Sequence, residues 1–102
     1  MAIPYGRRVI RRRVVVIGDV QGVYFRDTCR RVASELRVSG WVRNLPDGSV
    51  EAAFEGSPDA VARLVEWANR GPRTAQVDQV DVYNEEPERL TGFEIRPTPY
   101  RG

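Results

Sequence analysis

Residues 18–26 combine amino-acid types that can bind an anion. The segment reads Gly-Asp-Val-Gln-Gly-Val-Tyr-Phe-Arg and joins an apolar run that ends at Ile17 to an amphipathic segment. A strand that turns through glycines into a helix leaves backbone N–H groups free at the positive end of the helix dipole. Arg26 adds a planar cation close to those groups. The segment therefore predicts a cradle for a phosphate or a carboxylate.

These residues also have simpler interpretations. Glycines at a strand-to-helix turn can serve backbone geometry alone, and the segment lacks both the Walker pattern and the dinucleotide-binding fingerprint. Asn44 stands where a strand is expected to end, so it can belong to a turn or can hold a water molecule through its carboxamide. Cys29 lies on an apolar helical stripe, which predicts a buried small side chain rather than a nucleophile.

The chain has no histidine and one cysteine, which excludes several kinds of chemistry. Ser–His and Cys–His catalytic pairs, zinc sites of His and Cys, and an intrachain disulfide cannot form. The early apolar run, Val14 to Ile17, is too short for a signal-peptide core or a membrane span. We therefore expect a soluble, cytoplasmic protein that has no contact with a membrane.

The positive charge is concentrated at the N-terminus. All 16 basic residues are arginines, and residues 1–13 hold five of them without an acidic residue, whereas the remainder holds 11 arginines against 14 acids. We expect residues 1–8 to be a loose arm and the arginines that follow to be a solvated strand start. A basic arm is only weak evidence for contact with an acidic partner. The rest of the chain has more acidic than basic residues, which argues against a nucleic-acid-binding surface.

Periodicity and turn residues divide the chain into seven elements. Ser57-Pro58 is a typical helix start and Gly71-Pro72 a typical helix stop, and Leu45-Pro46-Asp47-Gly48 is a typical hairpin turn. Val50, Ala52 and Phe54 alternate with more polar residues, as in a strand with one buried face. The sequence predicts strands at 9–17, 40–44, 49–55, 77–83 and around 93–95, helices at 23–37 and 58–70, and an acidic loop at 84–91.

This order, βαββαβ with a further short strand, predicts the α+β class. Two amphipathic helices on one face of a mixed, mostly antiparallel sheet would bury both apolar stripes. We therefore expect a ferredoxin-like α/β sandwich that forms a single domain over residues 1–102. Periodicity does not fix the order of the strands.

The two candidate segments together resemble a known family. Residues 16–26 are similar to the first signature of the acylphosphatase family, and Gly40-Trp41-Val42-Arg43-Asn44 with Gly48-Ser49-Val50 and Gly56 are similar to its second. The similarity runs over residues 9–96, through Gly71-Pro72, Val77-Asp78 and Gly92-Phe93-Glu94-Ile95. The resemblance implies a ferredoxin-like hydrolase of acyl phosphates such as acetyl, carbamoyl or acylated sugar-acid phosphates.

The resemblance also implies roles for individual residues. It makes Arg26 and Asn44 the catalytic residues, and it implies no metal and no organic cofactor. The ligands are a small-molecule acyl phosphate and inorganic phosphate, without nucleic acid, and we expect a monomer. We expect Asp19 and Asp27 to point away from the phosphate. The residues implied to bind the substrate phosphate are Val20, Gln21, Gly22, Val23, Tyr24, Phe25 and Arg26.

Other functions fit a ferredoxin-like fold. A non-catalytic module that binds an anion or a small molecule could use the same loop without turnover. An RNA-recognition sheet is disfavoured, because the strand after the hairpin offers one phenylalanine and two acids. A third alternative is a domain that serves a larger carbamoyl-transfer machine, although a chain of this length favours the free enzyme.

Overall fold

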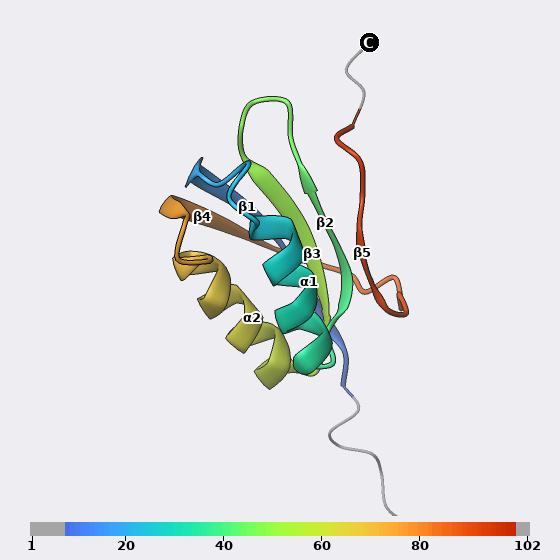
Figure 1. Cartoon of the computed structure of the whole chain (residues 1–102). Helices are drawn as coiled ribbons and strands as arrows, with labels where there is room; N and C mark the ends of the chain where they lie inside the picture. Colours follow the sequence, from blue (N-terminus) through green and yellow to red (C-terminus); the bar gives the residue numbers. More distant parts are fainter. Residues whose placement is uncertain (1–7, 100–102) are drawn as a thin grey trace, which may run out of the picture.

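The computed structural model describes residues 8–99 and arranges them as a five-stranded sheet with two helices (Figure 1). The predicted order of elements is confirmed. Apart from Arg8, which is exposed, the predicted N-terminal arm lies outside the described residues. The elements are β1 (Ile10–Asp19), α1 (Phe25–Glu35), β2 (Ser39–Asn44), β3 (Val50–Gly56), α2 (Pro58–Arg70), β4 (Gln76–Glu85) and β5 (Phe93–Ile95).

The strand order, which periodicity left open, is β4-β1-β3-β2-β5. β3 is antiparallel to both β1 and β2, β4 is antiparallel to β1, and β5 is parallel to β2. Figure 1 shows both helices on one face of this sheet, which is the expected ferredoxin-like α+β arrangement. Because β1 and β2 both run opposite to β3, their carboxyl ends lie at the same edge of the sheet.

The core lies between the helices and the sheet, where the alternating apolar residues of the strands meet the helix stripes. Val14 and Val16 of β1 and Phe54 of β3 are almost fully buried there. Burial also raises the pKa of the Cys29 thiol, which is inaccessible, as predicted. The helices contribute Phe25, Cys29 and Ala33 from α1 and Val61, Leu64 and Ala68 from α2.

Helix α1 is shorter than predicted at both ends. It begins at Phe25 because Tyr24 has a left-handed backbone, with φ of 64°, and cannot join the helix. It ends at Glu35, and Arg37 then adopts φ of 60°. Helix α2 has the predicted bounds, because the Ser57 side chain accepts a hydrogen bond from the Ala60 backbone N–H at 3.2 Å. Neither helix is long and apolar enough to cross a membrane.

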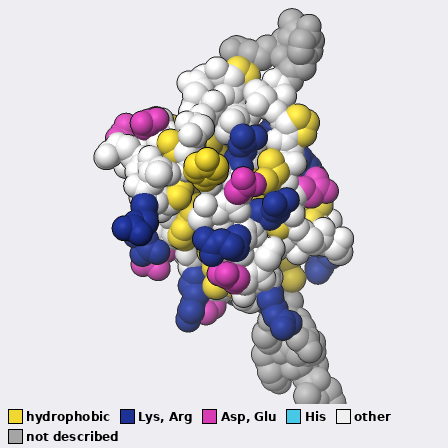
Figure 2. Space-filling view, viewed as in Figure 1, with side chains coloured by type: hydrophobic (Ala, Val, Ile, Leu, Met, Phe, Trp, Pro, Cys, Tyr) yellow, Lys and Arg dark blue, Asp and Glu magenta, His cyan; other side chains and the backbone are white. Residues whose placement is uncertain are grey.

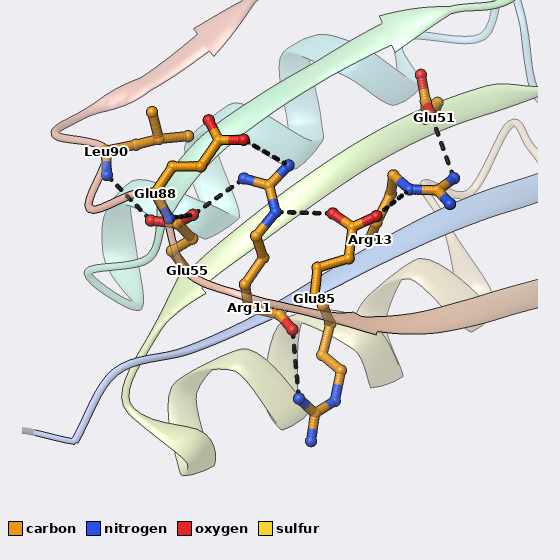
Figure 3. Close-up of polar contacts among 8 residues, drawn as sticks. Arg11, Arg13, Glu51, Glu55, Glu85, Glu88 and Leu90 are labelled. Atoms are coloured by element: carbon orange, nitrogen blue, oxygen red, sulfur yellow. Dashed lines mark hydrogen bonds and ion pairs between the residues drawn. The ribbon is translucent and has the colours of Figure 1, made fainter.

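The opposite face of the sheet carries a charge cluster, which we define as Arg11, Arg13, Glu51, Glu55, Glu85 and Glu88 (Figure 3). The Arg11 side chain donates to Glu55 at 2.9 Å and to Glu85 at 2.8 Å, and Arg11 is only 5% exposed. The expectation of a solvated arginine segment is therefore wrong for Arg11. The expected acidic loop also begins too early, because β4 continues to Glu85, which lies opposite Arg11 in the ladder.

Glu55 connects this cluster to the segment before β5. Its carboxylate accepts hydrogen bonds from the backbone N–H groups of Glu88 at 2.7 Å and Leu90 at 3.0 Å (Figure 3). Burial alone would raise the pKa of Glu55, but these two donors and the Arg11 guanidinium outweigh burial and hold the pKa below its usual range. The ionised carboxylate therefore fixes the course of the chain from β4 to β5.

Candidate active site

Strand β1 leaves the sheet through a backbone that requires glycine. The ladder between β1 and β4 is irregular between Ile17 and Gly18, where Gly18 has φ of 144°. A Cβ at Gly18 would collide with the Gln76 carbonyl, so a larger residue would separate the two strands. Gly22 has φ of 74° and no atom within 4 Å of the place of a Cβ. Both glycines thus meet a local steric need, and Gly22 also leaves open space beside the loop.

The loop between β1 and α1 presents free backbone donors. The N–H groups of residues 21–24 make no hydrogen bond to other residues within 8–99, and no side chain caps α1 at Tyr24. The first turn of a helix also leaves its N–H groups without helical partners. Thr74 Oγ1 donates to the Val23 carbonyl at 2.7 Å and holds the loop from the side of β4. The loop can therefore donate several hydrogen bonds to one anion.

These donors border a pocket of about 290 Å³. Its lining residues are Val20, Gly22, Tyr24, Phe25, Arg26, Asp27 and Ile95, so five of the seven predicted phosphate-binding residues line one cavity. Phe25 is buried against Trp67, with 5.1 Å between the ring centroids, and anchors the first turn of α1. The next side chain, Arg26, is half-buried and makes no hydrogen bond or ion pair with any described residue. Its guanidinium is available for a ligand.

Asn44 approaches the same edge of the sheet from β2. It is the last residue of that strand and shares a sheet face with the buried Val42, two positions earlier, so its side chain points to the helix side. The carboxamide oxygen Oδ1 is buried and accepts no hydrogen bond from the described part of the chain. An unsatisfied buried acceptor costs about 1–3 kcal/mol, which favours a water molecule or ligand as its partner.

Gln21 connects the two predicted catalytic segments, a role that the sequence analysis missed. Its Nε2 donates to the carbonyls of Leu45 and Ser49, at 2.8 Å each. These carbonyls belong to the hairpin directly after Asn44. The Gln21 side chain therefore fixes the hairpin of Asn44 against the loop that leads to Arg26, although Gln21 and Asn44 do not line the pocket themselves.

The two acidic residues near the loop are exposed to solvent. Asp19 is exposed, and Asp27 borders the pocket but is also exposed, with 3.8 Å between its carboxylate and the Arg30 guanidinium. Figure 2 shows basic and acidic side chains interspersed over the helix-covered face of the molecule. Within residues 8–99 no three acidic or cysteine side chains are grouped to hold a metal ion.

Fold and pocket together place the chain among small ferredoxin-like α+β proteins with a pocket at the junction between the first strand and the first helix. The model of the acylphosphatase family matches residues 12–95. The chain belongs to the acylphosphatase family, as its two signatures suggested.

Known members agree with this assignment along most of their length. An acylphosphatase of Gloeobacter violaceus is 56% identical over 86 residues, which cover 84% of this chain and 92% of the relative. A solved acylphosphatase of Coxiella burnetii superposes with a TM-score of 0.85 at 36% identity, over 94% of this chain and 100% of that chain. An acylphosphatase of Bacillus subtilis gives a TM-score of 0.83 at 33% identity, over 85% and 98%.

Proposed function

We propose that this chain hydrolyses acyl phosphates by holding the phosphoryl group in the 20–26 loop and on Arg26, while Asn44 positions the attacking water. Acylphosphatase activity itself follows from the family and from relatives that share more than half of their aligned residues. The division of roles is supported by one observation above all. The free Arg26 guanidinium lies in the first turn of α1, just after β1, and the unsatisfied Asn44 carboxamide lies at the end of β2. Because β1 and β2 run in the same direction, both groups lie at the same edge of the sheet.

The chemistry of the substrate explains why few catalytic groups suffice. The bond that breaks joins phosphorus to the acyl oxygen, and the leaving group is a carboxylate whose acid has a pKa of about 4 to 5. Such a group departs without a general acid. Phosphoryl transfer then needs in-line placement of the nucleophile and stabilisation of charge on the equatorial oxygens. The loop N–H groups and Arg26 supply the stabilisation.

The nucleophile is water, and it must lose a proton in a site without histidine. Asn44 Oδ1 accepts a hydrogen bond from this water and directs its oxygen toward phosphorus. As the phosphorus–oxygen bond to the water forms, its proton passes to a phosphoryl oxygen of the substrate. The products are a carboxylate and inorganic phosphate, which occupies the same loop and competes with the substrate.

A phosphate-release assay tests this proposal. The purified chain is given acetyl phosphate in the presence of a chelator and without added metal. We expect turnover, and we expect Asn44→Ala to lower kcat by about a hundredfold or more while inorganic phosphate inhibits nearly as strongly as before. Asn69→Ala, on the exposed side of α2, is the matched control and keeps native kcat.

Two results would contradict the proposal. Native kcat in Asn44→Ala would remove the role of Asn44 in positioning water. A folded chain that binds phosphate but releases none from acetyl phosphate would favour the non-catalytic anion-binding module instead.

The assembly and location of the enzyme are part of the same proposal. We infer a monomer, because the β1–α1 loop, α1, β2 and β5 of one chain supply the described residues of the site. The single buried cysteine fits a reducing compartment, so we infer that the enzyme acts on a free small molecule in the cytoplasm. Sedimentation of the purified chain at assay concentration tests the monomer, since a stable dimer would contradict it.

A further inference from the structure

Tyr24 is the most exposed large hydrophobic residue that the structure describes, and it stands at the rim of the pocket. The residue is 74% exposed, although the neighbouring Phe25 is buried. Its backbone has φ of 64°, a conformation that glycine or asparagine adopts at lower cost than a bulky residue. Neither core packing nor backbone geometry accounts for an aromatic side chain at this position.

Hydrogen bonds anchor the backbone on both sides of Tyr24. The Tyr24 carbonyl accepts a hydrogen bond from the Thr28 N–H at 3.1 Å, and the preceding Val23 carbonyl accepts one from the Thr74 hydroxyl at 2.7 Å. Both peptide groups beside the ring are therefore anchored. An anchored backbone keeps the ring at the rim of the pocket and lowers the conformational cost when a ligand contacts it.

A second apolar side chain borders the same pocket from another element. Ile95 belongs to β5 and lies opposite Val42 in the parallel ladder, where the Arg96 N–H donates to the Val42 carbonyl at 2.9 Å. Tyr24 and Ile95 line one pocket together with Arg26. The substrate's acyl group is bonded directly to the phosphoryl group, so it must lie within a few atoms of the loop and Arg26.

We propose that Tyr24 and Ile95 form an acyl-binding subsite that favours aromatic and other apolar acyl groups over small ones. This inference rests on the proposed function, because it assigns a binding site to the acyl group of the same substrate, whose phosphoryl group the loop binds. The tyrosine ring packs against the acyl group by its face or edge. Ile95 provides the apolar surface on the β5 side.

The test compares benzoyl phosphate with acetyl phosphate in the native chain and in Tyr24→Ala, Tyr24→Gly and Tyr24→Phe. The measured quantity is the ratio of the two kcat/KM values. We expect the native enzyme to prefer benzoyl phosphate and both truncations to lower the ratio by about three- to tenfold. Tyr24→Phe keeps the ring and retains the ratio. Tyr83→Ala removes an exposed tyrosine from β4 and is the matched control.

Each outcome has a distinct meaning. A ratio that is unchanged in Tyr24→Ala, in an enzyme that hydrolyses both substrates, overturns the subsite and leaves the proposed function intact. A ratio restored in Tyr24→Gly but not in Tyr24→Ala assigns the effect to backbone strain and also overturns the subsite. If the native chain hydrolyses neither substrate, the proposed function itself fails. A lower ratio in both truncations supports the subsite.

Discussion

The charge cluster and the pocket use similar residues in opposite ways. In the cluster Arg11 contacts three carboxylates, and the Glu55 carboxylate accepts from one guanidinium and two backbone N–H groups (Figure 3). Arg26 at the pocket and the Asn44 carboxamide oxygen at the same sheet edge have no such partners among residues 8–99. The difference teaches that hydrogen-bond partners, more than residue type, separate a structural arginine from one that is available for substrate.

The two regions are nevertheless connected through β5. The buried Glu55 carboxylate binds the backbone at Glu88 and Leu90, and this segment leads into the strand that places Ile95 at the pocket. The charge cluster therefore supports the β5 wall of the pocket. Variants in the cluster should act on the free energy of unfolding, and variants at the pocket on catalysis.

The largest expected effect is the loss of the Glu55 carboxylate. Glu55→Ala removes the most buried partner of the Arg11 guanidinium and the acceptor of the Glu88 and Leu90 N–H groups, and we expect the free energy of unfolding to fall by about 3–5 kcal/mol. Urea denaturation followed by circular dichroism measures this change. Turnover per folded molecule stays close to the native value, because Glu55 does not line the catalytic pocket and β5 keeps its own ladder with β2.

Two further variants sharpen this prediction. Glu35→Ala removes an exposed carboxylate, 3.5 Å from Arg31, and should cost less than about 1 kcal/mol. The double variant Arg11→Met with Glu55→Leu removes both charges and should be less destabilised than Glu55→Ala. A loss in Glu55→Ala no larger than in Glu35→Ala would show that the cluster behaves as solvated surface.

The opposite pattern is expected for Arg26→Ala. Removal of this donor should lower kcat/KM by about a hundred- to a thousandfold and weaken inhibition by inorganic phosphate. The free energy of unfolding should barely change, since Arg26 makes no ion pair within the described chain. Arg30→Ala, one turn later in α1 and 3.8 Å from Asp27, is the matched control and keeps native kcat/KM. A large loss of stability in Arg26→Ala would remove the contrast between the regions.

The sequence predicted those helices, strands and candidate site residues that depend on neighbouring residues in the chain. Ser57 caps α2, Gly71 ends it, and the apolar stripes set which faces are buried, so spacing along the chain was sufficient. The helix start was misplaced because a left-handed Tyr24 leaves no pattern in the sequence. Arg26 and Asn44 were candidates from their positions in the sequence, but their catalytic roles came from the resemblance to two family signatures, since neither residue type is distinctive alone.

The missed features depend on contacts between distant parts of the chain. Arg11 donates hydrogen bonds to Glu55 and Glu85, which lie 44 and 74 residues away in the sequence. No local pattern distinguishes Arg11 from the arginines beside it. The Gln21 side chain likewise bonds carbonyls 24 and 28 residues away. Such partners follow from strand order and register, which hydrophobic periodicity does not determine.

A smaller effect is expected from the Gln21 contact between loop and hairpin. Gln21→Ala removes two hydrogen bonds, but the Leu45 and Ser49 carbonyls keep other partners, the N–H groups of Gly48 and Leu45. We expect a loss of about 1–3 kcal/mol in the free energy of unfolding, since each bond contributes about 0.5–1.5 kcal/mol.

The same variant should lower kcat more than it weakens inhibition by inorganic phosphate, because the hairpin that carries Asn44 shifts relative to the loop. Gln79→Ala is the matched control, because it removes an exposed side chain of β4 that bonds Asp81. Equal kinetics in the two variants would mean that Gln21 contributes to packing alone.

The smallest expected effect is the acid dependence of stability that comes from the half-buried Glu85. Hydrogen bonds from Arg13 and Arg11 lower the pKa of Glu85, so its contribution to stability is present above the unfolded pKa of about 4.3 and disappears as pH falls through the lower folded pKa. Glu85→Gln should therefore cost about 1 kcal/mol or less at pH 7 and almost nothing near pH 2. Urea denaturation of both proteins at several pH values measures the difference. A difference that grows on acidification would mean that Glu85 is not stabilised as the carboxylate, and the cluster would then end at Arg11 and Glu55.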